Sequence, residues 1–555
     1  MGSIKLTLSA FTIWRVGSKT RSMNANGLRL PREAGPRVLF LFAASIILLP
    51  VLTAIWFGIT QGGGDSWDHI LNNRVLPHTV TTLAVLALTG MLCLLFAVPT
   101  AWLVSRYRFP GRTLFSWALI LPLAIPGYVM AYAWADLTNV AGPIQTMLRD
   151  ATGWSARDYV FPDVFNIPGL SFVLATTLFP YVYITARAAF ANQSLCTLEA
   201  ARSLGANAWS CFMRVAVPAA RPAIVAGLAL ALMEAAADYG AADFLGIKTL
   251  GVGVVNSWYS FSEPASAARL ALILITIAFA FLFVERLFRG QQGSQQTSDR
   301  WRSPELETLT GRSAVLVTLL CGALLLVSFM LPVGRLLWLS IEVRDVMPDI
   351  LSPLLSTLIL ASSGTLLALL CAIILTLSTR ESGQQLARFA GAAGYAAPGA
   401  VLALGGVLLL AALGISPSGP FAFFILIWLY ASRFTAAGTG PLESAMLRAP
   451  RSLNHAARSL SIPRTKRLFA IDLPLLRPGL FAGLLILFIE TLKELPATFM
   501  LRPLEWETLA VKAHTYAGDE RFAQAMMPSL LITLAGLAPV LLLSWQMSRS
   551  RRIND

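Results

Sequence analysis

The chain has 555 residues, of which 56% are hydrophobic and only 13% are charged, and its formal net charge at pH 7 is +14. Charged residues make up about 25% of an ordinary soluble domain, so the composition excludes a soluble globular protein and indicates a membrane protein. The positive charge would also suit a nucleic-acid-binding protein, but no basic stripe interleaved with aromatic residues is present, which argues against that class.

Apolar runs close to the ~20 residues needed to cross a bilayer recur about twelve times along the chain. The first six lie near residues 38–59, 82–104, 114–137, 169–189, 223–245 and 269–288. The other six lie near 313–337, 355–377, 389–413, 420–437, 479–501 and 528–547. The sequence therefore predicts an all-α membrane protein with about 12 transmembrane helices.

Consecutive spans place successive connecting segments on opposite sides of the membrane. The basic residues are concentrated in the segments on one of these sides. Of the 43 Lys and Arg residues, 32 fall in these segments, and Arg433 is counted among them. Because Lys and Arg accumulate on the cytoplasmic side of membrane proteins, we expect these segments and both termini to be cytoplasmic. No short apolar region with a cleavage site precedes Val38, so the first span is expected to be an uncleaved anchor.

A short segment occurs twice: "EAARSLG" begins at Glu199, and "HAARSLS" begins at His455, 256 residues later. The same spacing relates further residues downstream: Pro218 to Pro474, Arg221 to Arg477, Pro222 to Pro478, Gly227 to Gly483 and Glu234 to Glu490. Since the matched residues include Pro, Gly, Arg and acids, shared hydrophobicity does not explain the repeat. The two halves of the chain are predicted to be duplicated domains.

Six spans in each half return the chain to its starting side, so the halves are expected to share one orientation and a pseudo-twofold axis along the membrane normal. The predicted division has five parts: a cytoplasmic segment 1–37, a six-span domain 38–289, a cytoplasmic linker 290–312, a second six-span domain 313–547 and a tail 548–555. The linker is rich in Gly, Gln and Ser, which cannot form a packed core. The sequence around Thr82 in the second span resembles that around Thr357 in the eighth, so these two residues are expected to be equivalent.

The repeated segments are predicted to be short helices on the inner side. Gly205 can adopt the left-handed conformation that ends a helix, and Pro463 stops the second copy. Their Ala residues allow another surface to approach closely, and Arg202 and Arg458 could pair across that contact. The alternative, that they are only connecting loops, does not account for their duplication at fixed distances.

The segments "EAARSLGANAWSCFMRVAVPAARPAIVAG" and "HAARSLSIPRTKRLFAIDLPLLRPGLFAG" resemble the EAA loop of permease subunits of bacterial ATP-binding cassette (ABC) importers, the MetI-like superfamily. In the second copy His455 replaces the Glu and Ser461 replaces the Gly. The resemblance implies a coupling helix that docks in a groove on a cytoplasmic ATPase subunit. It assigns this role to Glu199, Ala200, Ala201, Arg202 and Gly205, and to His455, Ala456, Ala457, Arg458 and Ser461.

Segments after each loop, "EAAADYGAADFLGIKTLG" and "ETLKELPATFMLRPLEWE", resemble those of fused, twelve-span ferric iron permeases. This resemblance implies a bacterial inner-membrane protein that works with two cytoplasmic ABC ATPase subunits and a periplasmic or lipid-anchored substrate-binding protein. Permeases for thiamine, phosphonates or oxyanions share the scaffold, so another small solute remains an alternative.

The energy source is expected on another polypeptide. The phosphate-binding motif GxxxxGK[ST] is absent, so ATP and Mg²⁺ would be bound by the partner ATPase, and this chain is expected to be a transport subunit and not an enzyme. No covalently bound cofactor is predicted. His and Cys residues lack metal-ligand spacing, so no stable metal site is evident.

Four acids lie within predicted spans: Glu234 and Asp238 in the fifth, and Glu490 and Glu494 in the eleventh. Ionisable groups in a bilayer cost several kcal/mol unless they are paired or hydrated, which makes them functional candidates. Around a pseudo-twofold axis they could line a translocation path, and Tyr239 could add a phenolic oxygen. Oxygen ligands suit ferric ion. The alternative is a structural network in which Lys493, nearby Arg residues and backbone groups satisfy the acids.

The predicted mechanism is alternating access between the halves, driven by ATP binding and hydrolysis on the partner. An ion-coupled secondary transporter with two similar halves is the competing class, in which the acids would serve a proton or sodium ion. An EAA-type loop in each half argues against that class.

Overall fold

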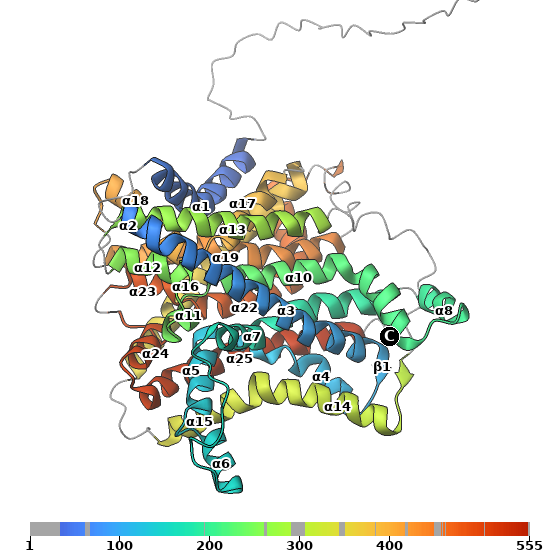
Figure 1. The fold of residues 1–555 in the computed structure, drawn as a ribbon. Coiled ribbons are helices and arrows are strands. Elements are labelled where there is room, and N and C mark those ends of the chain that lie inside the picture. The colour runs from blue at the N-terminus through green and yellow to red at the C-terminus, as the bar shows by residue number, and fades with distance from the viewer. Residues whose placement is uncertain are drawn as a thin grey trace, which may run out of the picture.

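The computed structural model describes residues 34–60, 67–193, 195–259, 263–289, 306–342, 350–382, 385–416, 420–448, 457, 459–460, 462–503 and 506–552. Most of the predicted segment 1–37 and of the predicted linker 290–312 lies outside these residues, as does the end of the tail. The described chain is almost entirely helical (Figure 1).

The first half contains α1 (Ala34–Thr60), α2 (Trp67–Ile70), η1 (Leu71–Val75), α3 (Leu76–Arg106), β1 (Tyr107–Arg108), α4 (Arg112–Ala118), η2 (Leu121–Ala124), α5 (Gly127–Thr138), α6 (Pro143–Thr152), α7 (Ile167–Ala191), α8 (Leu195–Ser203), α9 (Ala208–Ser210), η3 (Cys211–Ala216), α10 (Val217–Ala237), α11 (Gly240–Phe244), α12 (Leu250–Tyr259) and α13 (Pro264–Arg289). The second half contains β2 (Glu307–Thr308), α14 (Gly311–Leu325), η5 (Leu326–Met330), α15 (Leu331–Glu342), α16 (Leu351–Ser382), α17 (Gln385–Ala396), α18 (Gly399–Ala412), α19 (Pro420–Arg448), α21 (Arg464–Arg467), η7 (Leu468–Asp472), α22 (Leu473–Leu492), α23 (Pro496–Leu501), α24 (Leu509–Gly518) and α25 (Phe522–Arg552).

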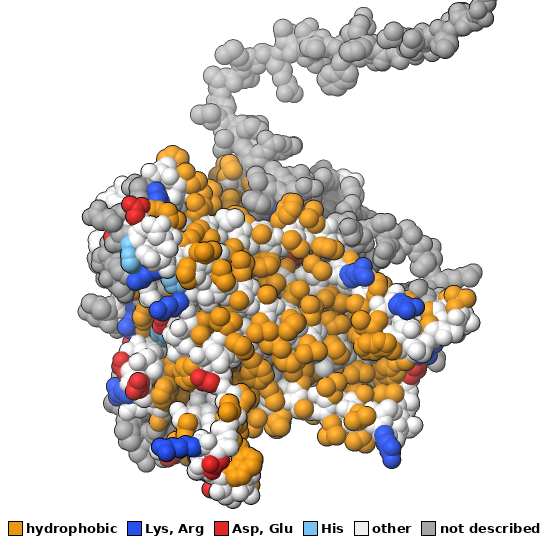
Figure 2. Space-filling view, viewed as in Figure 1, with side chains coloured by type: hydrophobic (Ala, Val, Ile, Leu, Met, Phe, Trp, Pro, Cys, Tyr) orange, Lys and Arg blue, Asp and Glu red, His pale blue; other side chains and the backbone are white. Residues whose placement is uncertain are grey.

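Among the described residues, 10 helices are long and apolar enough to cross a membrane, or up to 12 if each of two bent helix pairs counts as one span. The bent pairs, Arg112–Ala124 with Gly127–Thr152 and Ala390–Ala396 with Gly399–Ala412, turn by 97° and 108°. Each half holds one bent pair and five long helices, which confirms the prediction of about twelve spans. Hydrophobic side chains cover the middle of the face in Figure 2, and charged ones gather at its two ends.

Proline produces the two bends at equivalent places. Pro126 and Pro398 are 272 residues apart, and each precedes the second helix of its pair with an extended backbone (φ near −60°, ψ 149° and 147°). Proline fixes φ and cannot donate a backbone hydrogen bond, so the chain turns there and restarts at a glycine.

Each half also contains an equivalent hydrogen bond between a long helix and the start of a short one. Thr82 Oγ1 accepts a hydrogen bond from the backbone N–H of Leu250 at 2.9 Å, and Thr357 Oγ1 accepts one from Leu509 at 2.8 Å. In a bilayer a backbone donor without a partner costs several kcal/mol, so each threonine secures the start of a short helix, α12 or α24. The predicted equivalence of Thr82 and Thr357 is confirmed.

The halves exchange their first helices. Helix α1 packs against α16, α17, α18 and α19 of the second half, and α14 and α15 contact α4 and α5 of the first half. Pro50 within α1 has no N–H for the carbonyl of Ile46, and Trp428 Nε1 of α19 donates to that carbonyl at 2.8 Å. The carbonyl of Ile47 accepts from Ser432 Oγ at 2.7 Å.

Two sequence-based placements need correction. Arg433 lies inside the span Phe421–Met446 and is buried, not in an inner segment, because its charge is neutralised within the protein. The fifth and eleventh predicted spans end earlier than expected, at Ala237 and Leu492, where α10 and α22 stop. Within the predicted linker, residues 306–312 are described, and β2 pairs in parallel with β1 there.

Candidate functional site

Helix α8 carries the first of the two repeated segments, which we call the first and second coupling segments after their predicted role, and it lies at one end of the molecule (Figure 1). Gly205 has φ +85°, the left-handed conformation expected from the sequence. The N–H of Ala206 donates to the carbonyl of Ala201 at 3.0 Å, and the N–H of Gly205 donates to that of Arg202 at 2.9 Å, which completes the helix end. Glu199, Ala200 and Arg202 are exposed and Ala201 is partly buried.

Both coupling segments present an exposed leucine. Leu204 is 88% exposed, and Leu460, 256 residues later, is 74% exposed. Trp209 adds a further apolar side chain, 68% exposed, beside the first segment. Of the second predicted set, Ala457 is buried, and His455, Ala456, Arg458 and Ser461 lie outside the described residues.

Glu307 of β2 ties the first coupling segment to the end of α3. Its carboxylate accepts from Arg202 Nη2 at 2.9 Å and from Arg106 Nη2 at 2.8 Å. These hydrogen bonds, that of Arg202 first, hold the pKa of Glu307 below its usual range, although burial opposes them. Sequence analysis missed Glu307, because nothing in the polar segment before α14 indicates that it pairs with the other half.

The five predicted path residues, Glu234, Asp238, Tyr239, Glu490 and Glu494, line one central cavity. Arg433 and Lys493 line the same cavity. The cavity lies between the halves, where α10 and α22 end and where the first bent pair turns at Pro126 and Gly127.

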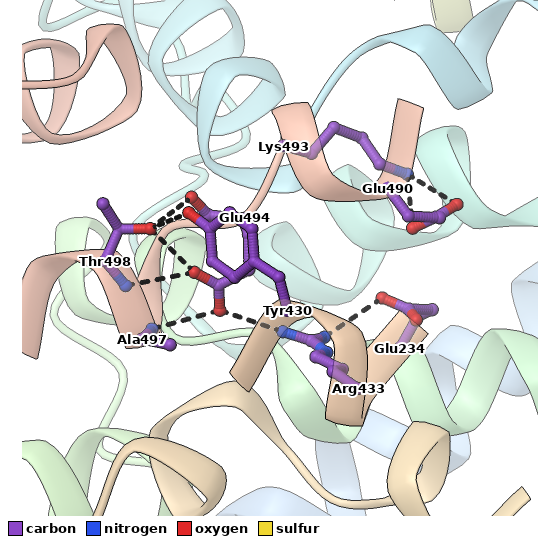
Figure 3. A network of polar contacts seen from close by, with 8 residues as sticks. All are labelled: Glu234, Tyr430, Arg433, Glu490, Lys493, Glu494, Ala497 and Thr498. Carbon is purple, nitrogen blue, oxygen red and sulfur yellow. Dashed lines mark hydrogen bonds and ion pairs between the residues drawn. The ribbon is translucent and has the colours of Figure 1, made fainter. Parts of the chain in front are cut away.

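Arg433 joins an acid from each half (Figure 3). Its Nη1 donates to Glu494 Oε1 at 3.2 Å, and its Nη2 lies 3.6 Å from Glu234 Oε2. The side chains of Arg433 and Glu494 are 8% and 0% exposed. A buried charge with no partner is very unfavourable, so Arg433 and the two acids depend on one another for their burial.

Glu490 has partners of its own. Lys493 Nζ lies 3.1 Å from Glu490 Oε2, and the hydroxyl of Tyr181 donates to Glu490 Oε1 at 3.0 Å. Tyr181 comes from the first half and Glu490 from the second, so this contact also crosses the interface between the halves.

The remaining acid of each pair caps a helix break. Asp238 Oδ1 accepts from the N–H groups of Ala241 and Ala242 at 3.0 and 3.3 Å. Glu494 accepts from the N–H groups of Ala497 and Thr498 at 3.0 and 3.1 Å, and from Thr498 Oγ1 at 3.0 Å. Carboxylates are favourable at helix N-termini, where backbone donors have no helical partner.

The acids therefore have the partners that a structural network requires, and they also line the cavity that a path requires. The path assignment stays a prediction. Sequence analysis missed Arg433 because it counted this residue among the cytoplasmic basic residues. Its position within an otherwise apolar run could have indicated that it lies in the membrane. No three His, Cys, Asp or Glu side chains in the described part of the chain are grouped to hold a metal ion.

Comparisons with known proteins agree with this architecture. The family model described as binding-protein-dependent transport system inner membrane component matches residues 94–291. The Fe(3+)-transport system permease protein FbpB 2 of Haemophilus influenzae is 24% identical over 484 residues, covering 86% of this chain and 89% of that protein. The sulfate transport system permease protein CysT of Escherichia coli is 27% identical over 249 residues, which cover 44% of this chain and 87% of that protein.

The probable sulfate transport system permease protein cysT of Nephroselmis olivacea is 32% identical over 198 residues, covering 35% of this chain and 67% of that protein. Like the family model, these relatives are transport permeases. The chain is a multi-pass membrane protein that belongs to the family of inner membrane components of binding-protein-dependent transport systems.

Proposed function

We propose that this permease carries ferric iron, delivered by a substrate-binding protein on the outer face, and that separate cytoplasmic ABC ATPase subunits drive it. The H. influenzae relative, named as an Fe(3+)-transport permease, is matched along most of both chains, whereas the E. coli CysT protein matches less than half of this one. Sulfate or another small solute is the alternative substrate.

The charge of the central cavity is the observation that carries the proposal. Its lining includes four carboxylates, Glu234, Asp238, Glu490 and Glu494, and two cationic groups, Arg433 and Lys493. The formal balance is two negative charges in excess. Such a lining attracts a cation and repels an oxyanion in a low-dielectric interior, and carboxylate oxygens suit a hard ferric ion.

The two coupling segments support docking of an ATPase dimer. Large exposed apolar side chains rimmed by polar ones are typical of protein interfaces, and Leu204 and Leu460 supply one at each equivalent position. Glu199 and Arg202 are the exposed polar neighbours of the first segment. The cytoplasmic position of these segments, and of both termini, belongs to this proposal.

In the proposed cycle, closing of the ATPase dimer moves the coupling segments and rocks one half against the other. Contacts that join the halves across the cavity, such as Arg433 with Glu234, would then be remade in a different arrangement. Hydrolysis resets the cycle, and this chain itself contributes no covalent chemistry.

Uptake by proteoliposomes tests the proposal. The chain and its ATPase are reconstituted with ATP inside, and binding proteins loaded with ferric ion, sulfate or thiamine are added outside. ATP-dependent accumulation of iron alone is the expected result. Accumulation of sulfate or thiamine in place of iron would keep the permease mechanism and reject the ferric substrate, and uptake without any ATPase would indicate a secondary transporter. The unloaded binding protein is the control.

A further inference from the structure

We propose that Tyr239, Asp243 and His514 form a transient binding site for ferric ion at the end of the central cavity that faces away from α8, and that Tyr132 orients His514. The inference rests on the proposed function and specifies where the substrate is first held by the permease. Helices α11 and α24, which carry Asp243 and His514, lie at the opposite end of the molecule from α8 (Figure 1).

Two of the candidate ligands, Tyr239 and His514, lie beside one carboxylate oxygen of the third, Asp243. Tyr239 Oη lies 3.2 Å from Asp243 Oδ2, and His514 Nε2 lies 3.3 Å from the same atom. Ligands about 2.0–2.2 Å from a metal and at right angles to one another are about 3 Å apart. The two observed separations are therefore close to those between neighbouring ligands of one metal ion.

The donor types match a ferric ion. Phenolate and carboxylate oxygens are hard ligands, and imidazole also binds iron. Binding would displace the phenolic proton of Tyr239 to water, because a metal ligand must be deprotonated. Asp243 would supply a carboxylate and His514 a neutral nitrogen.

Tyr132 controls which nitrogen of His514 is available. Its hydroxyl lies 2.9 Å from His514 Nδ1. When Nδ1 carries the proton and donates it to Tyr132 Oη, the lone pair of Nε2 points toward Asp243 and can bind a metal. Such outer contacts fix the orientation of metal-binding histidines. Tyr132 is fully buried, so its position is set by packing in the core.

The site is accessible on one side and continuous with the cavity on the other. The side chain of Asp243 is 31% exposed, whereas that of His514 is 7% exposed. Tyr239 also lines the central cavity. Tyr128 lines it too, and its buried hydroxyl has no hydrogen-bond partner among the described residues. A cation leaving the site would next meet this free phenol and the carboxylate of Asp238.

The site has no counterpart in the pseudo-symmetric half. At the spacing of 256 that aligns the helix breaks, Tyr239 corresponds to Leu495 and Asp243 to Phe499. Thr249 and Thr508 accept equivalent helix-start hydrogen bonds from Val252 and Val511.

At the spacing that relates Thr249 to Thr508, His514 corresponds to Val255. The cluster is therefore not one of the duplicated helix-start or helix-break contacts.

The site also spans the two halves. Tyr239 and Asp243 belong to the first half and His514 to the second. Rocking of the halves would separate the histidine from the other two ligands, which would lower the affinity and release the ion into the cavity. Movement of the halves alone would thus couple binding and release of the ion to the transport cycle.

Absorption spectroscopy on the purified full-length chain in lipid nanodiscs tests the assignment, with ferric nitrilotriacetate as the probe. A tyrosinate bound to ferric iron gives a visible charge-transfer band. We expect this band in the wild-type protein, its loss in Tyr239→Phe, and an apparent ferric affinity at least roughly 10-fold weaker in Asp243→Asn and His514→Gln. Tyr132→Phe should retain the band with weaker affinity.

Tyr259→Phe is the matched control. Tyr259 lies near Phe499 and donates its hydroxyl hydrogen to the Phe499 carbonyl at 2.8 Å, but it is not a proposed ligand, so its variant should keep both band and affinity. Thermal unfolding checks that each variant is folded. A wild-type protein without the band, or a band that persists in Tyr239→Phe, would overturn the inference.

Uptake measurements separate this outcome from failure of the proposed function. If the wild-type permease accumulates iron in proteoliposomes while no band forms, the site is wrong and the function stands. If it accumulates another solute and not iron, the ferric substrate is wrong and the site assignment falls with it.

Discussion

The break after α10 in the first half and the break after α22 in the second are capped in the same way. Asp238 accepts hydrogen bonds from two backbone N–H groups that follow it, and Glu494 does the same. The buried threonines Thr82 and Thr357 also serve equivalent N–H groups. Contacts that satisfy the backbone in a bilayer are thus preserved in both halves, because each half needs them in order to fold.

The side chains that face the cavity differ between the halves. Arg433 of α19 corresponds, 256 residues earlier, to Thr177 of α7, and both line the cavity. Only the second half supplies the guanidinium that joins Glu234 and Glu494. The centre therefore holds one asymmetric ion triad. Arg433→Met and Gly399→Ala test this asymmetry, and the later changes test the contacts of Thr82, Thr357 and Glu307.

The largest effect is expected from Arg433→Met. The substitution leaves Glu234 and Glu494 as buried acids without their cation, and breaking a buried ion pair in this way costs about 3–5 kcal/mol. The melting temperature of the full-length chain in detergent should fall strongly. Thr177→Val, at the equivalent place, is the control and should cost about 1 kcal/mol or less. Similar losses for the two variants would contradict the asymmetry.

Gly399→Ala is expected to rank second. A Cβ atom there would lie 2.6 Å from Arg433 Nη1 and would also meet Glu494 Oε1, so the triad has to shift. Overpacking of this kind costs about 1–3 kcal/mol. At the equivalent Gly127, a Cβ would lie 2.8 Å from Asp238 Oδ2, which has no arginine to hold it in place. Unfolding in detergent should therefore show a smaller loss for Gly127→Ala, and the reverse order would count against the triad.

Thr82→Val and Thr357→Val test a contact that the two halves share. Each removes the hydroxyl that accepts from a buried N–H, of Leu250 or Leu509, and keeps the shape of the side chain. Each should cost about 1–2 kcal/mol, and the two losses of thermal stability should be equal within error. A loss confined to one half would mean that the two threonines are not equivalent.

Glu307→Gln should have the smallest effect on stability, since partly exposed ion pairs contribute little. It should release α8, so that amide hydrogen exchange within Leu195–Ser203 becomes roughly two- to fivefold faster. Exchange in the equivalent second coupling segment should not change. Uniform exchange rates in the variant and wild type would show that Glu307 does not hold α8.

The same contact has a defined pH dependence. Because hydrogen bonds from Arg202 and Arg106 lower the pKa of Glu307 in the folded protein, its contribution is complete above the ordinary pKa of a glutamate. It is lost only as the pH falls through the lowered pKa. Faster exchange of α8 at neutral pH than at acidic pH, after correction for intrinsic rates, would contradict this sign.

Features with a periodic or repeated signal could be predicted from the sequence. Apolar runs indicated the spans, and the spacing of 256 aligned both coupling segments and both acid pairs. The end of α8 at Gly205 followed from the conformational freedom of glycine.

Contacts between residues far apart in the chain could not be predicted in this way. The pairing of Glu307 with Arg202, the position of Arg433 between two acids and the approach of His514 to Asp243 each depend on how the helices pack. A single sequence carries no periodic signal for these contacts.

The exchange of first helices has a consequence for biogenesis. Pro50 leaves the carbonyl of Ile46 without a helical partner, and the donor that satisfies it, Trp428, is synthesised 382 residues later. Until the second half has been inserted, α1 lacks the donor that satisfies this carbonyl in the folded protein. The first half is therefore an unfinished folding unit when it leaves the ribosome, and the membrane must retain it until its partner helices arrive.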